Sequence, residues 1–218
     1  MELTKEQIQY IDNLLKKEGI KYWDIRIEML DHIATDIEQN AESDDFTIEL
    51  KNSLNHLGWL GNLSYLNTKG WKDINKFYRR KFHEQILNFF KQPKTVTFSI
   101  VFIALNIYFS QILPFKVFTV LHFIFFALPI LLIIFFWIKN AFKKHGKSIH
   151  LNYGVFYSSL SIMFLNPIIY LLKYFNESTQ KIIFLIIIPI YLIASYSGFL
   201  LYKSAIKKVE QMKKELSL

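Results

Sequence analysis

The sequence predicts an all-α membrane protein: a small cytoplasmic helical bundle, an amphipathic juxtamembrane helix and a four-helix transmembrane domain. Two observations lead to this class. The 218 residues are 52% apolar and include only seven glycines and five prolines, a composition that favours helices over turn-rich folds. Charge is divided unequally, because residues 1–62 carry 13 acidic and 6 basic side chains whereas the other 156 carry 5 and 20. We therefore expect an acidic soluble part followed by a basic, apolar part.

The first domain, residues 1–70, is predicted to be the helical bundle. Its first helix begins with a capping box, because Thr4 and Gln7 have the spacing at which each side chain bonds the other's backbone. A second helix is expected over about residues 22–40, and a third ends at Gly58. A bundle of this size is near the lower limit for a stable core, so we expect it to lean on a neighbour.

Residues 71–94 are predicted to form a basic amphipathic helix before the first membrane span. Apolar residues, most of them aromatic, recur there at steps of three and four, and basic residues occupy much of the remaining surface. This pattern is typical of a helix in the headgroup layer, where Lys76, Arg79 and Arg80 would bind anionic lipid headgroups. The alternative is that the aromatic stripe packs on the bundle and the charges are only solvated.

The third domain, residues 95–218, contains four stretches that are long enough to cross a hydrocarbon core of about 30 Å and hold no Asp, Glu, Lys or Arg. They cover about residues 96–113, 117–138, 151–172 and 182–202. Lys and Arg gather before the first stretch, between the second and third, and in the tail after the fourth. The positive-inside rule then places the N- and C-termini in the cytoplasm. Because the Lys-, Ile- and Asn-rich chain shows no signal peptide and no eukaryotic targeting signal, we expect a multi-pass protein of the bacterial inner membrane.

The second predicted helix carries a family resemblance. Residues 23–38 read WDIRIEMLDHIATDIE, and an acidic turn, a third helix and Leu57-Gly58-Trp59 follow. This arrangement resembles the HAAS-type helical domain at the N-terminus of small multi-spanning bacterial membrane proteins. The resemblance covers residues 4–66, and the chain departs from the family in the length of its acidic loop and in Trp59. It implies a cytoplasmic signalling or adaptor role, in some bacteria alongside PadR-like regulators, and no established catalysis.

The nearest approach to a metal site is Glu28 and His32, one helical turn apart, with Asp31 beside His32, Asp24 one turn earlier and His56 able to approach from the third helix. Acid and base at this spacing are commonly an ordinary helix-stabilising pair, and no second pair completes a coordination shell, so we expect no metal and no cofactor. The chain also has no cysteine, which excludes disulfides and thiolate ligands. The acids of the second helix are instead expected to be exposed and to bind a protein partner in the cytoplasm: Asp24, Glu28, Asp31 and Asp36.

Few polar side chains occur within the predicted spans, where they are costly and usually face the interior of the bundle. Asn106, His122 and Asn166 are the candidates for a small polar pocket, and interhelical hydrogen bonding is the alternative. Pro129, Pro167 and Pro189 can each bend a helix. No span holds the carboxylate that a proton- or sodium-coupled carrier generally uses, and no catalytic motif is found, so we do not expect an enzyme.

These observations predict a regulatory, signalling or scaffolding role through the cytoplasmic bundle, with the membrane domain as its anchor in the lipid bilayer. The expected partners are anionic lipids, a cytoplasmic protein and further copies of the same chain. Nucleic acid is not expected, because the basic residues adjoin apolar runs. The alternative function is a small permease or transporter component with a polar pocket between its membrane helices. A membrane enzyme acting on lipids or isoprenoids is a third hypothesis, which no motif supports.

Overall fold

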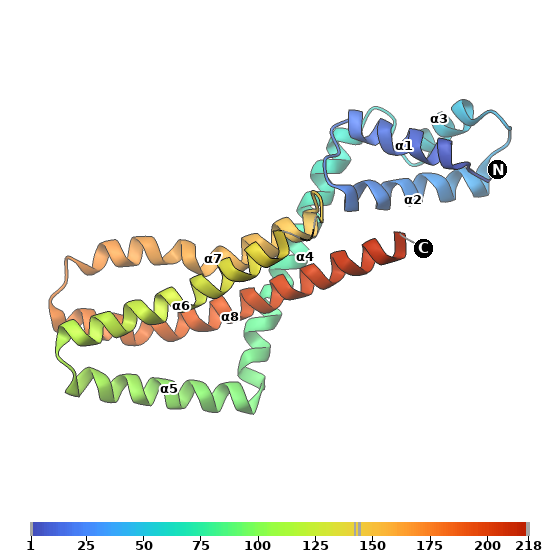
Figure 1. The fold of residues 1–218 in the computed structure, drawn as a ribbon. Helices are drawn as coiled ribbons and strands as arrows, with labels where there is room; N and C mark the ends of the chain where they lie inside the picture. The colour runs from blue at the N-terminus through green and yellow to red at the C-terminus, as the bar shows by residue number, and fades with distance from the viewer. Residues whose placement is uncertain (1, 142, 144, 217–218) are drawn as a thin grey trace. The chain divides into compact units, whose positions relative to one another are not determined.

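The structure, a computed structural model, is all-helical, with 85% of residues in helices and no strand among the residues that it describes. It describes the backbone of residues 2–141, 143 and 145–216, and their side chains except those of residues 64, 164–169, 171 and 216. The helices of this part of the chain, labelled in Figure 1, are α1 (Lys5–Lys17), α2 (Trp23–Asn40), α3 (Phe46–His56), α4 (Leu63–Lys91), α5 (Pro93–Ile112), α6 (Phe115–Ala141), α7 (Ile149–Leu172) and α8 (Glu177–Leu216).

The chain forms two compact units. Unit 1 consists of Met1–Lys76, His145–Leu151 and Val209–Leu218, so it joins α1, α2, α3 and the start of α4 to the first turn of α7 and the end of α8. Unit 2 consists of Phe77–Lys144 and Asn152–Lys208, which hold the end of α4, α5, α6 and most of α7 and α8. Three distant parts of the sequence therefore build unit 1.

Local sequence signals lie at the ends of the short helices of unit 1, and the predicted capping box is confirmed. Thr4 and Gln7 form the capping box, with the Thr4 N–H donating to Gln7 Oε1 at 2.8 Å. After α1, Gly19 has a φ of 85°, which glycine adopts without strain. Asp45 is the N-cap of α3 and accepts a bond of 2.8 Å from the N–H of Thr47.

Unit 1 has a core that extends beyond the three short helices. Ile11 and Leu15 of α1 and Ile33 of α2 are fully buried. Val209, in the part of α8 that belongs to unit 1, is fully buried as well. A bundle of about 60 residues buries little apolar surface by itself. The end of α8 enlarges the core of unit 1 by burying Val209 in it.

Three of the described helices are long and apolar enough to cross a membrane: α5, α6 and α8. The predicted span 151–172 falls on α7, and the side chains of residues 164–169 and 171 are outside the description, so this span remains a prediction. The predicted span 182–202 lies within α8, but α8 is a single helix of 40 residues that continues well beyond it. Its last part is polar and belongs to unit 1.

Within unit 2, α7 and α8 pack closely through small residues. A Cβ added to Gly198 of α8 would lie 2.6 Å from the carbonyl oxygen of Tyr157 in α7, so only glycine permits this approach. A Cβ added to Gly154 of α7 would lie 2.8 Å from the Cβ of Ala205 in α8. The hydroxyl oxygens of Ser161 and Ser195 lie 2.8 Å apart and share a hydrogen bond between the two helices. Small residues and hydroxyl pairs of this kind are typical of helix packing in membranes.

Candidate functional site

The first feature of unit 1 that stands out is the buried carboxylate of Asp24, which is only 2% exposed. It accepts hydrogen bonds from the Ser148 hydroxyl at 2.6 Å and from the N–H groups of Ile149 at 3.1 Å and His150 at 3.2 Å. Asp24 therefore caps the start of α7 from α2. The expectation that Asp24 is an exposed partner-binding charge is wrong. The N–H groups at the start of α7 have no partner within their own helix, and the buried carboxylate of Asp24 satisfies them.

The loop before α7 is held by Trp23, the residue before Asp24. The indole N–H of Trp23 donates to the carbonyl oxygen of His145 at 2.9 Å, and its backbone N–H donates to that of Lys147 at 3.1 Å. Gly146 has a φ of 72°, and a Cβ there would lie 3.3 Å from the Trp23 ring. The ammonium of Lys213, near the end of α8, lies 5.8 Å from the centre of the same ring, a cation–π distance.

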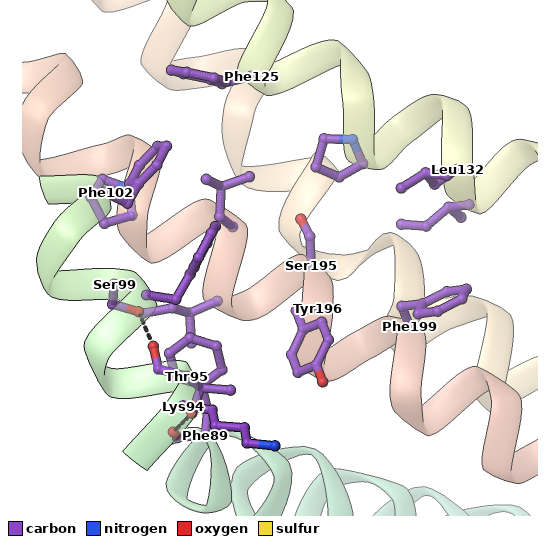
Figure 2. A pocket seen from close by; sticks show the side chains of 16 residues that line it. Phe89, Lys94, Thr95, Ser99, Phe102, Phe125, Leu132, Ser195, Tyr196 and Phe199 are labelled. Carbon is purple, nitrogen blue, oxygen red and sulfur yellow. Dashed lines mark hydrogen bonds between the residues drawn. The ribbon is translucent and has the colours of Figure 1, made fainter. Parts of the chain in front are cut away.

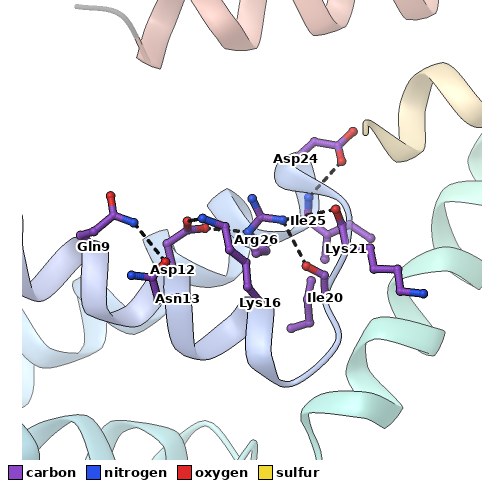
Figure 3. A network of polar contacts seen from close by, with 9 residues as sticks. All are labelled: Gln9, Asp12, Asn13, Lys16, Ile20, Lys21, Asp24, Ile25 and Arg26. Carbon is purple, nitrogen blue, oxygen red and sulfur yellow. Dashed lines mark hydrogen bonds and ion pairs between the residues drawn. The ribbon is translucent and has the colours of Figure 1, made fainter. Parts of the chain in front are cut away.

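An ion-pair network lies between α1 and α2 (Figure 3). Arg26 Nε donates to Asp12 Oδ1 at 2.7 Å, and its guanidinium also donates to the carbonyl oxygen of Ile20 at 3.1 Å. Lys16 pairs with the other Asp12 oxygen at 2.5 Å. Burial raises the pKa of Asp12, but the bonds from Lys16 and Arg26 outweigh it and hold that pKa below its usual value. This network joins α2 to α1 and to the turn that follows α1.

The other predicted acids of α2 differ in exposure. Glu28 and Asp31 are exposed, as a docking surface requires. Asp36 is half-buried and accepts a hydrogen bond from His56 Nδ1 at 2.6 Å. Burial raises the pKa of Asp36, but the contacts with His56 and Asn40 keep it below its usual value.

The candidate metal pair of α2 does not gain further ligands in the described part of the chain. The His32 ring lies against Trp59 in an edge-on contact, with 6.0 Å between centroids. His56 is paired with Asp36. Among the described residues, no group of three His, Asp or Glu side chains is arranged to hold a metal ion.

Protein covers much of the aromatic stripe of α4. Trp71 contacts Tyr22 in unit 1, with 5.4 Å between ring centroids. In unit 2, Tyr78 is 2% exposed and stacks on Tyr153 of α7, while Phe82 lies 5.6 Å from the ring of Tyr157. Neither predicted alternative describes the stripe fully, because only its first part lies on the bundle and the residues after it pack on α7.

The basic residues proposed to bind lipid headgroups lie on the exposed side of α4. Lys76, Arg79 and Arg80 are all exposed. Arg80 Nε lies 3.6 Å from Glu84, a solvent-exposed pair that contributes little stability. Their positive charge is therefore accessible, and headgroup binding remains a prediction.

The candidate polar residues of α5 and α6 bond back to their own helices. Asn106 donates from Nδ2 to the carbonyl oxygen of Phe102 at 2.7 Å, and His122 Nδ1 lies 2.8 Å from that of Phe118. Both residues are buried, and Asn106 Oδ1 and His122 Nε2 have no hydrogen-bond partner in the described part of the chain. The side chain of Asn166 lies outside the described residues. The pocket predicted from these three residues is therefore not assembled by any described contact.

Unit 2 contains a cavity elsewhere, of about 510 Å³, between the end of α4 and the helices α5, α6 and α8 (Figure 2). Neither Asn106 nor His122 lines it. Most of its wall is aromatic or aliphatic, and Lys94 supplies the one charge among its lining residues. The volume lies in the range typical of ligand pockets. Pro129 and Pro189 both line the cavity, so the prolines were the sequence signal that could have located it.

Comparison of the chain with known protein families, with curated proteins and with solved structures gives no match. The likeness of residues 4–66 to the HAAS-type domain is thus an inference from the sequence, and function must be argued from the two units themselves.

Proposed function

We propose that the chain is an integral membrane protein with a regulatory, signalling or scaffolding role, and that unit 1 is its cytoplasmic part and binds a protein partner. The observation that supports this proposal most strongly is which segments of the chain make up unit 1. Unit 1 includes His145–Leu151 and Val209–Leu218, which are continuous in sequence with α7 and α8. A small sliding of either helix would therefore move part of the core of unit 1, as transmission from a membrane to a soluble domain requires.

Four membrane spans are part of the proposal: α5, α6, α7 and α8. The length and apolarity of α5, α6 and α8 support three of them. The fourth is supported by α7, whose 24 residues include no Asp, Glu, Lys or Arg. Its close packing on α8 through Gly154 and Gly198 also supports it, because glycine contacts are characteristic of neighbouring membrane helices.

An even number of spans returns the chain to the side on which it started. The Lys and Arg residues before α5, between α6 and α7 and in the last part of α8 support a cytoplasmic location for both termini. A bacterial inner membrane accommodates this topology. The HAAS-like pattern of residues 4–66 supports the signalling or adaptor role, since the family resemblance implies one.

The partner surface that we propose is the exposed acidic side of α2, with Glu28 and Asp31 at its centre. Asp36 lies on the same helix one turn further on, paired with His56. A partner with a basic surface would be steered to these charges. Asp24 is not part of this surface.

The test is to isolate the full chain from membranes of its own cells and compare the proteins that accompany wild type and variants. We expect Glu28→Lys combined with Asp31→Lys to lose a specific cytoplasmic protein, because each reversal places like charges opposite each other. Glu42→Lys, which reverses an exposed acid outside this surface, should keep that protein. If the same proteins accompany all three chains, the acidic side of α2 is not the partner surface.

The alternative, a small permease or transporter component, is favoured by one observation. Asn106 Oδ1 and His122 Nε2 are buried acceptors without a described partner, as a site for a passing polar solute would provide. Solute uptake into proteoliposomes that His122→Gln abolishes would support this alternative over the regulatory role.

A further inference from the structure

The cavity of unit 2 offers a ligand few polar groups, because the hydroxyls of Thr95, Ser99 and Ser195 in its wall already form hydrogen bonds within the protein. The Thr95 hydroxyl donates to the carbonyl oxygen of Phe89. The Ser99 hydroxyl donates to the carbonyl oxygen of Thr95 at 2.9 Å. Ser195 shares its hydrogen bond with Ser161. Figure 2 shows the bonded hydroxyls at the α5 wall and the Lys94 ammonium below them. A ligand would therefore meet an apolar body with one positive charge at one end.

The depth of the cavity corresponds to one leaflet of a bilayer. Its α5 wall runs from Lys94 to Phe102, a rise of about 12 Å along a helix. Half of a hydrocarbon core of about 30 Å is about 15 Å. The charged end therefore lies at the start of α5, and the far end, near Phe125 and Pro129, lies near mid-depth of the proposed membrane domain.

Two features explain why the side chains leave space here. α6 and α8 each carry a proline that lines the cavity, Pro129 and Pro189, and a proline inside a helix removes a backbone hydrogen bond and bends the helix. α5 also packs loosely, since Asn106 is its only buried residue among those described. The wall formed by α5 can therefore admit a chain from the side.

The charge at the cavity entrance selects the ligand. No acidic residue occurs in the sequence between Glu84 and Glu177, and no described carboxylate pairs with Lys94, which is exposed. We propose that this cavity holds an acyl chain of an anionic membrane lipid, with the lipid phosphate at Lys94. An ammonium at the surface of the membrane attracts anionic lipid, and an acyl chain in the cavity gains packing contacts with the apolar side chains of its wall. The inference rests on the membrane placement in the proposed function and extends it by naming a ligand.

The test uses the full chain in nanodiscs that contain equal amounts of phosphatidylglycerol and phosphatidylcholine with identical acyl chains, followed by native mass spectrometry of the lipids that stay bound. We expect wild type to retain phosphatidylglycerol about fivefold over phosphatidylcholine, the effect of one surface charge. Lys94→Gln should bring this ratio to about one while lipid is still retained. Leu192→Trp, which fills the cavity, should reduce retention of both lipids about tenfold, because a chain that no longer fits loses its packing contacts with the cavity wall, and about 1.4 kcal/mol of such contacts corresponds to this factor.

Matched controls come from residues that do not line the cavity. Lys91→Gln removes an exposed lysine three residues earlier, and Leu105→Trp adds a tryptophan on the exposed side of α5, so both should behave as wild type. Ser99→Phe fills the cavity from the opposite wall and decides the question if Leu192→Trp does not fold. The proposal is overturned if wild type shows no preference, if Lys94→Gln keeps it, or if both filled variants retain lipid normally. A chain that does not enter nanodiscs at all would instead contradict the membrane placement.

Discussion

At the scale of single residues, Asp24 carries more interactions than the other acids of α2. Its two carboxylate oxygens accept bonds from Ser148, Ile149 and His150, and one of them also accepts from the N–H of Ile25 at 3.2 Å. Helical N–H groups in a first turn have no partner within the helix, so a carboxylate there satisfies them and interacts favourably with the helix dipole. The contact links residues 124 to 126 positions apart in the sequence.

Removing this carboxylate should loosen the start of α7. We expect Asp24→Ala to cost about 2 kcal/mol locally, since it deletes a helix cap and leaves buried N–H groups without an acceptor. Amide hydrogen exchange of the full chain, read at Ile149 and His150, should then become about thirtyfold faster. Asp31→Ala, an exposed acid of the same helix, is the control and should leave exchange at both amides unchanged. Equal exchange in the Asp24 variant would mean that the cap does not stabilise this turn.

Residue-scale features could be predicted where the partners are neighbours in sequence. Thr4 and Gln7 are three positions apart, so their spacing alone predicts the capping box. Asp24 has the same local appearance as the exposed acids that follow it, and only the fold brings Ser148 to it. Sequence periodicity shows that a carboxylate is present but not which distant donor it will meet.

At the scale of helices, the contact of α7 with α8 depends on the absence of a side chain at one position. A Cβ on Gly198 would lie 2.6 Å from the Tyr157 carbonyl oxygen and 3.0 Å from the Ser158 Cα. Both are backbone atoms, which cannot rotate away as a side chain can. The two helices would have to separate, with loss of contacts along their length.

We therefore expect Gly198→Ala to destabilise unit 2. Overpacking of this kind costs about 2 kcal/mol, which corresponds to a Tm lower by about 4–8 °C in thermal unfolding of the full chain in detergent micelles. Gly70→Ala is the matched control, because its Cβ would meet only Ile25 Cδ1, at 4.0 Å. Alanine also favours a helix over glycine, so the control should leave Tm unchanged or raise it. A Gly198 variant as stable as the control would show that the helices do not approach this closely.

The positions of the helices could be predicted well, but their contacts could not. The predicted spans 96–113 and 117–138 coincide with most of α5 and α6, because runs of apolar residues without charge are long and distinct. The apolar stripe of α4 was also recognised, yet Tyr78 and Phe82 pack on α7 rather than on lipid or on the bundle alone. A periodic pattern defines the apolar face of a helix, and any apolar surface can cover it.

At the scale of the whole molecule, the two units do not follow the order of the sequence. The chain enters unit 2 within α4, returns to unit 1 for His145–Leu151 and returns again for the end of α8. Composition alone suggests an acidic soluble part followed by a basic apolar part, since it averages over long stretches. It could not show that a short basic loop and the polar end of α8 complete the first unit.

This arrangement makes a prediction about topology that separates four spans from three. The chain contains no cysteine, so single cysteines can be introduced without a background of labelling. With four spans and cytoplasmic termini, a membrane-impermeant maleimide added to intact cells should label Lys116→Cys and Glu177→Cys. It should label Glu42→Cys, Lys147→Cys and Glu215→Cys only after the cells are permeabilised. All five positions are exposed, so access should depend only on the side of the membrane.

The two decisive positions are Glu177 and Glu215, at the two ends of α8. If α7 did not cross, Glu177 would stay on the same side as Lys147 and escape the reagent, while Glu215 would be labelled in intact cells. Unit 1 contains both the N-terminal helices and Val209–Leu218, and segments of one compact unit must lie on one side of a bilayer. An odd number of spans would put them on opposite sides, so labelling of Glu215→Cys in intact cells would contradict unit 1 itself as well as the fourth span.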